Sequence, residues 1–309
     1  MYIFTKYFHK FTTYSAEASN NIALGHMVMH NAHNNVYSNV SIGGFSLSSL
    51  EFGGGNVNVG RSGLKSLTNG WTNVGLGGNA LQELIEGSSN IAIGRDPLRE
   101  SLYSRNNIAI GSLSMANTQY SSGNVAIGVE TLKFLGENYD RYYTWDENEN
   151  LRPASGNVAI GGTSLKSLRE GPNNTVVGTY SFISLSEGDS NVAIGNGIFP
   201  NLTNGSRNVF VGNNIGWDNE TTLIDEITLI GSQTDVVSGV LNSTAIGARA
   251  IVTSSNTIQL GNDGIALVNT SGIVSATGFV GDGSGLKNVN LSGSIDQNGN
   301  LVIVDVEPT

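Results

Sequence analysis

Three histidines near the start of the chain are the first residues whose spacing suggests chemistry. They are His26, His30 and His33, and imidazoles this close together can bind Zn²⁺ or another divalent metal. Spacings of four and three residues do not guarantee that the rings converge when the chain forms a turn of a β-protein. We therefore expect a polar corner with no metal and no cofactor, and metal binding is the alternative.

A segment rich in aromatic and acidic residues, 137–153, is the strongest candidate for ligand binding. Aromatic faces stack on sugar rings, carboxylates accept hydrogen bonds from hydroxyl groups, and exposed aromatic side chains are common at recognition sites. The candidate receptor-binding residues are Tyr139, Tyr142, Tyr143 and Trp145. The alternative interpretation is that these rings fold back against the rest of the chain or against a neighbouring chain.

Motifs for catalysis are missing from the sequence. It holds no Gly-x-Ser-x-Gly nucleophile elbow, no His-Glu-x-x-His zinc site and no Gly-x-x-x-x-Gly-Lys phosphate loop. Carboxylates about 5–9 Å apart can cleave glycosidic bonds, and Asp146, Glu147 and Glu149 are candidates for such a pair. Because neighbouring acids in a loop are usually only solvated, we expect that the protein is not an enzyme. A glycan-degrading tail spike is the alternative.

Composition and charge exclude several other classes of function. Asp and Glu outnumber Lys and Arg by 25 to 15, so the net charge is −10, and without a basic cluster the chain repels nucleic acid. The absence of Cys excludes disulfides and thiolate-bound metals. The N-terminal apolar residues are interrupted by Lys6, His9 and Lys10, and no apolar run approaches about 18 residues, so neither a signal peptide nor a membrane helix is expected.

A five-residue motif, Asn–aliphatic–small–aliphatic–Gly, recurs along most of the chain. Its Asn residues are 17 residues apart from Asn39 to Asn124 and again from Asn157 to Asn208. Four residues after the motif Gly comes an apolar residue, usually Leu, and a second apolar residue follows three positions later. A fixed period of this length is typical of a solenoid, in which each repeat forms one coil and buries its apolar residues against its neighbours.

Each coil is predicted to contain a short strand at the motif, a short helical turn at the Leu-x-x-Leu segment and tight corners at Gly; a bent second strand is the alternative to the helical turn. Side chains two residues apart in a strand point to the same side, so we expect the Val and Ile positions, such as Ile93 and Ile110, to face the interior. The small residue between them should face outward and allow a second chain to approach around a three-fold axis. These small residues are Ala92, Ala109, Ala126, Ala159 and Ala193. The motif Asn residues should form a ladder of side-chain hydrogen bonds.

The repeat also defines the predicted organisation of the chain, which is all-β. Residues 1–20 are expected to form an N-terminal cap or connector, 21–264 a parallel β-solenoid or β-roll of about 17-residue coils, and 265–309 a short β-rich C-terminal stalk or cap. Residues 137–153 replace one motif, and we expect them to project from the solenoid as a loop.

The Asn-x-Ala-Ile-Gly repeats resemble those of bacteriophage tail-fibre proteins and, at a shorter spacing, the left-handed β-roll heads of YadA-like trimeric adhesins. In phage fibres, a Thr-Ile-x-Leu-Gly element and a Phe-Val-Gly-Asp-Gly-Ser-Gly-Leu segment often follow the repeats. Both are present here, at 257–261 and 279–286, and the resemblance covers roughly residues 21–290. YadA-like adhesins need a signal peptide and a membrane anchor as well, and neither is visible in this sequence.

The resemblance implies a homotrimeric, structural and adhesive fibre protein, most simply a phage tail-fibre or receptor-binding component located in the virion. Its expected partners are a glycan or protein receptor on the host surface and other tail or fibre proteins. No nucleic-acid partner and no membrane insertion are expected. A fragment of an adhesin on the bacterial cell surface is the alternative within the same class of function.

Overall fold

The computed structural model describes residues 20–32, 35–136, 155–217 and 223–264, and also 269, 271, 293–295 and 301–303. These residues form β-strands and turns, and no helix is present among them. The chain divides into two compact units, 1–264 and 265–309. Apart from Asn20, the N-terminal cap predicted at residues 1–20 lies outside the described residues.

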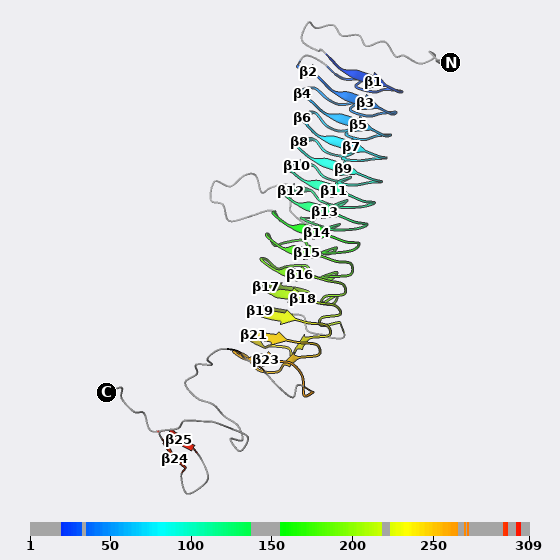
Figure 1. The fold of residues 1–309 in the computed structure, drawn as a ribbon. Helices are drawn as coiled ribbons and strands as arrows, with labels where there is room; N and C mark the ends of the chain where they lie inside the picture. The colour runs from blue at the N-terminus through cyan, green and yellow to red at the C-terminus, as the bar shows by residue number, and fades with distance from the viewer. Residues whose placement is uncertain are drawn as a thin grey trace. The chain divides into compact units, whose positions relative to one another are not determined.

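The first unit is a parallel β-solenoid of about 13 turns, with coils about 17 residues apart, which confirms the predicted solenoid. The motif strands of successive coils lie side by side in one parallel sheet, the first sheet, which is the ladder of arrows from β1 to β23 in Figure 1. Its strands, in spatial order, are β1 (Ile22–Leu24), β3 (Val40–Ile42), β5 (Val57–Val59), β7 (Val74–Leu76), β9 (Ile91–Ile93), β11 (Ile108–Ile110), β13 (Val125–Ile127), β14 (Val158–Ile160), β15 (Thr175–Val177), β16 (Val192–Ile194), β18 (Val209–Val211), β19 (Leu223–Ile230), β21 (Leu241–Ile246) and β23 (Ile258–Leu260).

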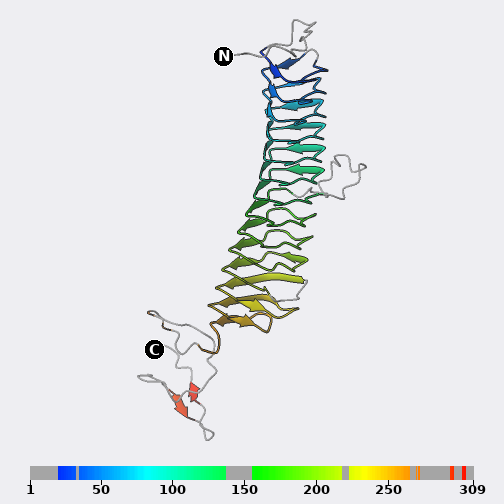
Figure 2. The same cartoon turned by 90° about the vertical axis from the view of Figure 1, so that its right-hand side faces the viewer.

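A second set of parallel strands forms on another side of the same coils, just before the motif Asn (Figure 2). We call it the second sheet, and its strands are β2 (Val36–Tyr37), β4 (Gly53–Gly54), β6 (Asn69–Trp71), β8 (Glu86–Ser88), β10 (Tyr103–Arg105) and β12 (Tyr120–Ser122). In later coils the pairing continues as isolated bridges, such as Glu170 with Glu187, and as β17 (Asn204–Ser206) beside β19. The short strands β20 (Asp235–Val236) and β22 (Ile251–Val252) pair with each other near the end of the solenoid.

The interior of the solenoid is lined by the middle residue of each motif, which is small in most coils, so the predicted sidedness of the first sheet is wrong. Ile93 and Ile110 lie half-buried on the outer side, and Ile194 is 45% exposed. The residues expected to face outward are all fully buried: Ala92, Ala109, Ala126, Ala159 and Ala193. Because strand side chains alternate between the two sides, a small inward residue leaves both neighbouring Val and Ile positions outside.

The physical reason for this sidedness is that each coil is thin. At Gly70, the buried middle residue of β6, an added Cβ atom would lie 2.7 Å from Leu67 Cδ1 and 2.8 Å from the carbonyl oxygen of Gly87. The two Leu side chains of each turn already fill the space between the sheets. In the coils with an inward Ala, a larger inward side chain would overpack this interior, which costs about 1–3 kcal/mol per residue. A larger inward residue is buried in the coils of Val176, Phe210 and Leu229.

The Leu-x-x-Leu segments form turns, and the predicted helical turn is absent from the described coils. The first Leu of the pair has a left-handed backbone, with φ of +50° at Leu64 and +54° at Leu81, and so does the residue two positions earlier, with +58° at Ser62. This conformation costs an L-residue about 1–2 kcal/mol and interrupts right-handed helical geometry. It also turns both side chains of the pair inward, and burying a Leu contributes about 1.5–3 kcal/mol, which offsets the strain.

The motif Asn residues form the expected ladder along the inner edge of the first sheet. The Oδ1 atom of Asn90 accepts hydrogen bonds from the backbone N and the Nδ2 atom of Asn107, both at 3.2 Å. Asn107 Nδ2 also donates to the carbonyl oxygen of Ser121 at 3.1 Å, in the second sheet. The same pattern recurs from Asn39 to Asn208, so the ladder bonds each coil to the next and bonds the first sheet to the second.

The second unit contains one described hairpin-like pair of strands, β24 (Gly293–Ile295) and β25 (Leu301–Ile303). They are antiparallel, with Ser294 opposite Val302. In the described residues this antiparallel pairing occurs only here, because every strand pair of the first unit is parallel.

Candidate functional site

The sequence-predicted binding segment, 137–153, lies outside the described residues, and with it Tyr139, Tyr142, Tyr143, Trp145 and the three candidate carboxylates. The described chain stops at Gly136 and resumes at Ser155. Ser155 pairs with Ser122, the last residue of β12. The segment is therefore inserted immediately before the second sheet resumes, while the first sheet continues from β13 to β14 in register.

The histidines of the first coil are placed only in part. His26 and His30 are exposed, and the His26 ring contacts Phe45 edge to face with a centroid distance of 5.3 Å. His33 lies outside the described residues. In the part of the chain that the structure describes, no group of three or more His, Asp or Glu side chains is arranged to hold a metal.

The outer side of the first sheet is a continuous aliphatic surface, which we call the aliphatic face. In each of the fourteen strands from β1 to β23, the three motif residues contribute two outward side chains, one on either side of the inward middle residue, and the aliphatic face consists of these two side chains per strand. All of them are Val, Ile or Leu except Thr175, Thr228 and Thr244, and none is charged. All are half-buried or exposed, up to 70% exposure at Ile258.

The outer side of the second sheet carries a different set of side chains, the aromatic strip, whose rings are Tyr37, Phe52, Trp71, Tyr103 and Tyr120. Tyr37 and Trp71 meet edge to face at 5.3 Å between ring centroids, although one coil lies between them. Tyr103 and Tyr120 stack at 5.5 Å, with an interplanar angle of 11°. Four of the rings are between 39% exposed (Trp71) and 51% exposed (Phe52).

Sequence reasoning missed the aromatic strip, although a signal for it exists. In the 17-residue frame, Tyr37 and Trp71 stand two residues before a motif Asn, and Phe52, Tyr103 and Tyr120 stand four residues before one. Positions two apart in a strand share a side. Reading the aromatics against the motif, coil by coil, would have placed all five on one face.

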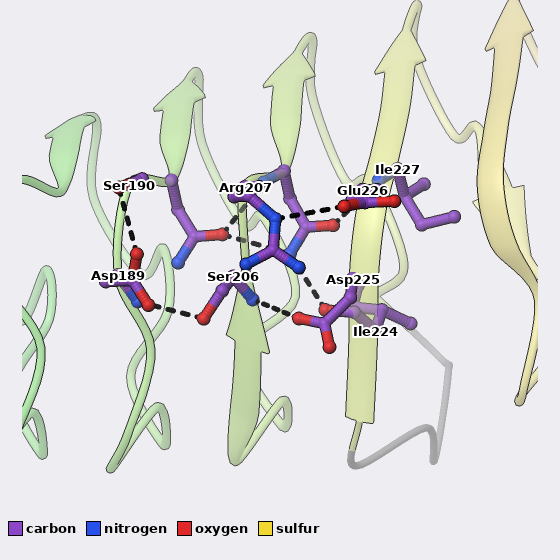
Figure 3. Close-up of polar contacts among 10 residues, drawn as sticks. Asp189, Ser190, Ser206, Arg207, Ile224, Asp225, Glu226 and Ile227 are labelled. Atoms are coloured by element: carbon purple, nitrogen blue, oxygen red, sulfur yellow. Dashed lines mark hydrogen bonds and ion pairs between the residues drawn. The ribbon is translucent and has the colours of Figure 1, made fainter.

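Later coils carry acidic side chains on this same side. Ser206 links Asp189 and Asp225: its Oγ atom accepts a hydrogen bond from the backbone N of Asp189 at 3.1 Å, and its backbone N donates to Asp225 Oδ1 at 2.6 Å (Figure 3). Beside them, Arg207 Nε donates to Glu226 Oε1 at 3.1 Å. These contacts join three successive coils, and we interpret the acidic groups as part of the framework.

A cluster of half-buried charged side chains joins two coils next to the inserted segment 137–153. Glu130 accepts a hydrogen bond from Lys133 Nζ at 2.8 Å, and from Lys166 Nζ of the next coil at 2.7 Å. The hydrogen bonds from Lys133 and then Lys166 hold the pKa of the Glu130 carboxyl below its ordinary value of 4.5. The carboxylate is therefore ionised at neutral pH and bridges the two coils.

Comparisons with protein-family models, with curated proteins and with solved structures give no match for this chain. In the described residues, no helix is long and apolar enough to cross a membrane.

Proposed function

We propose that this chain is a structural and adhesive fibre protein, a phage tail-fibre or receptor-binding component of the virion that attaches to the host surface as a homotrimer. The observation that carries the proposal is the aliphatic face. It extends over fourteen parallel strands without a charged side chain, which at about 4.8 Å per strand corresponds to about 62 Å.

A surface of this kind is best explained by association of identical chains. Isolated apolar side chains are normal on soluble proteins, but long contiguous apolar patches mark association surfaces. Burial of the Val and Ile side chains between copies contributes free energy in proportion to the apolar area removed from water. A closed three-fold arrangement lets each chain use the same face against both neighbours, so that no copy of the face stays exposed.

The coil stack and the inserted segment support an attachment role. A stack of near-identical coils held by the Asn ladder is a stiff spacer along one axis. A trimer presents three copies of each binding residue at the same height, so weak sites act together through avidity. The segment 137–153, with its four aromatic residues, is the proposed contact with a glycan or protein receptor, and other tail or fibre proteins are the proposed neighbours in the virion.

Assembly is tested by placing charge on the aliphatic face. The double variant Ile110→Asp, Ile127→Asp changes two outward side chains that are adjacent in the sheet register. Light scattering should give three times the chain mass of 32.4 kDa for the wild-type protein and one chain mass for the variant. Tyr180→Asp, at a corner residue that is 52% exposed and outside this face, is the matched control and should stay trimeric. A wild-type mass of one chain would contradict the assembly.

Attachment is tested on the inserted segment. A Tyr142→Ala, Trp145→Ala variant should bind host cells more weakly than wild type while the melting temperature and the oligomeric mass stay unchanged. Loss of thermal stability together with binding would identify these rings as framework instead. Wild-type protein that attaches to no candidate host cell would contradict the adhesive function.

A further inference from the structure

We propose that the aromatic strip of the second sheet is a binding site for a linear saccharide chain that lies along the solenoid axis. The proposal deepens the attachment function proposed above and rests on it for its biological purpose. The site consists entirely of described residues in the first six coils, and it is separate from the segment 137–153.

The first part of the site is an aromatic platform at β2, β4 and β6. Tyr37 and Trp71 occupy the same register position two coils apart, and Gly54 stands between them. A Cβ atom on Gly54 would lie 3.0 Å from the Tyr37 ring and 2.7 Å from its carbonyl oxygen. The absence of a side chain therefore lets the two rings meet across the intervening coil, and Phe52 lies next to Gly54 on the same strand side.

The second part is the stacked pair Tyr103 and Tyr120, on β10 and β12. In the coil between the two aromatic parts lie the outward side chains of Glu86 and Ser88, on β8. Asn69 and Arg105 flank them on β6 and β10, beside Trp71 and Tyr103. Amide, carboxylate, hydroxyl and guanidinium groups of this kind donate to and accept from sugar hydroxyls. The arrangement is aromatic, then polar, then aromatic along one line.

The length and period of this line fit an extended chain of pyranose rings. Strands in a sheet are about 4.8 Å apart, so the six strands from β2 to β12 span about 24 Å. The spacing of one coil is close to the length of one sugar residue in an extended saccharide, so successive rings can meet equivalent positions of successive coils. Apolar sugar faces would contact the aromatic rings, and equatorial hydroxyls would contact the polar side chains between them.

The framework of the second sheet does not require these rings. In later coils the register position of Phe52, Tyr103 and Tyr120 is occupied by Glu170, Glu187 and Asn204, and these residues still form bridges from coil to coil. Four of the five aromatic side chains are also about 40–50% exposed in the first coils, where burial yields only part of their apolar free energy. Their concentration in the first six coils is therefore better explained by a ligand than by folding.

A saccharide fits this surface better than a second copy of the chain does. The aliphatic face, which we propose as the association surface, carries no charged side chain. The aromatic strip lies instead beside the outward polar residues Glu86 and Asn69, and a purely apolar partner would bury these groups without hydrogen-bond partners. A ligand that is apolar on its faces and polar at its edges satisfies both sets of groups.

The test uses the full chain and an array of cellohexaose, chitohexaose and purified bacterial O-antigen and capsular polysaccharides. Wild-type protein should bind at least one of them. The Trp71→Ala, Tyr103→Ala variant should bind it at least about tenfold more weakly, which is about 1.4 kcal/mol. Trp217→Ala and Tyr180→Ala remove rings that are 43% and 52% exposed elsewhere on the solenoid and should bind as wild type does.

The Trp71→Phe, Tyr103→Phe variant keeps an aromatic ring at both positions and should retain most of the affinity. It therefore distinguishes a loss of ring stacking from a loss of binding caused by misfolding. The site is overturned if wild type binds no saccharide of the array, or if the alanine variant binds as tightly as wild type at unchanged oligomeric mass. Host-cell binding separates the failure of the saccharide site from the failure of the proposed attachment function.

If the alanine variant still attaches to cells and binds saccharide as wild type does, the saccharide site is overturned and the attachment function is not. Saccharide binding by a protein that attaches to no cell overturns the attachment function alone.

Discussion

The two exposed sheet faces of this solenoid have the same period but different chemistry. On the first sheet, both outward positions of every three-residue motif from β1 to β23 are Val, Ile, Leu or Thr. On the second sheet, equivalent outward positions change from coil to coil, from Phe52 and Tyr103 to Glu86 and Glu187. In most coils both sheets bury a small middle residue, so the two sheets share the constraint imposed by the thin interior. The difference supports the two proposals made above, because a uniform face suits one repeated contact between chains and a varied face suits a specific site.

The hydrogen bonding of the two sheets differs in the same way. The Asn ladder runs along the first sheet through almost every coil, and each Asn side chain has two or more partners. No comparable ladder of side chains runs along the outward positions of the second sheet in the described coils. The ladder therefore requires the first sheet to keep a constant coil spacing. The second sheet accommodates the inserted segment 137–153 just before Ser155, which pairs with Ser122.

The largest expected effect distinguishes the two sides of the first sheet. Ala109→Asp places a charge at a fully buried position without a partner, and we expect it to destabilise the surrounding coils by about 3–5 kcal/mol. Ile110→Asp, one residue away on the aliphatic face, should leave the β-sheet circular dichroism intact and lower the oligomeric mass instead. Thermal melting and light scattering on the same samples measure both quantities. Equal loss of folded structure in the two variants would contradict the sidedness described here.

A smaller effect is expected from the ladder. Asn107→Ala leaves Asn90 Oδ1 with the backbone N of residue 107 as a donor but removes the Nδ2 donor. It also removes the side-chain partners of the Ser121 carbonyl and of the Asn124 backbone N–H. Because these buried groups lose their hydrogen bonds, we expect a loss of about 2–4 kcal/mol in the free energy of unfolding. Ser88→Ala, an outward position of the second sheet, is the matched control and should change it by less than about 0.5 kcal/mol. Urea titration measures the free energy of unfolding of both variants. If Asn107→Ala destabilises the protein no more than Ser88→Ala does, the ladder does not distinguish the first sheet from the second.

The smallest effect is expected at Glu130, in the coil that precedes the inserted segment 137–153. Its pKa is depressed in the folded state, so its stabilising contribution is present above the unfolded pKa of 4.5 and is lost as the pH falls through the lower folded value. Glu130→Gln should therefore lower stability at neutral pH by less than about 1 kcal/mol. Wild type and variant should converge in strongly acidic solution. A difference that grows toward low pH would contradict the bridging role of Glu130 with Lys133 and Lys166.

Two predictions from the sequence were wrong for a common reason. The pattern Ile-Ala-Ile is equally compatible with Ile inside and Ala outside or with the reverse, because a period of two shows which residues share a side and not which side is buried. The Leu-x-x-Leu spacing fits a helical turn locally. Both choices depend on the width of the coil, which is set by how the Leu side chains of one turn pack against Gly70, Gly87 and their equivalents.

The sequence by itself determined the period, the parallel stacking of coils and the Asn ladder, because identical residues at a constant spacing pair with themselves in a stack. It also located the interruption at 137–153, as a break in that spacing. Only the tertiary structure decided which side of each strand is buried, the left-handed backbone of Leu64 and its equivalents, and the line formed by Tyr37, Trp71 and Tyr103 on one face. These features arise from contacts between coils and between sheets, and such contacts depend on the thickness of the interior, which no single repeat contains.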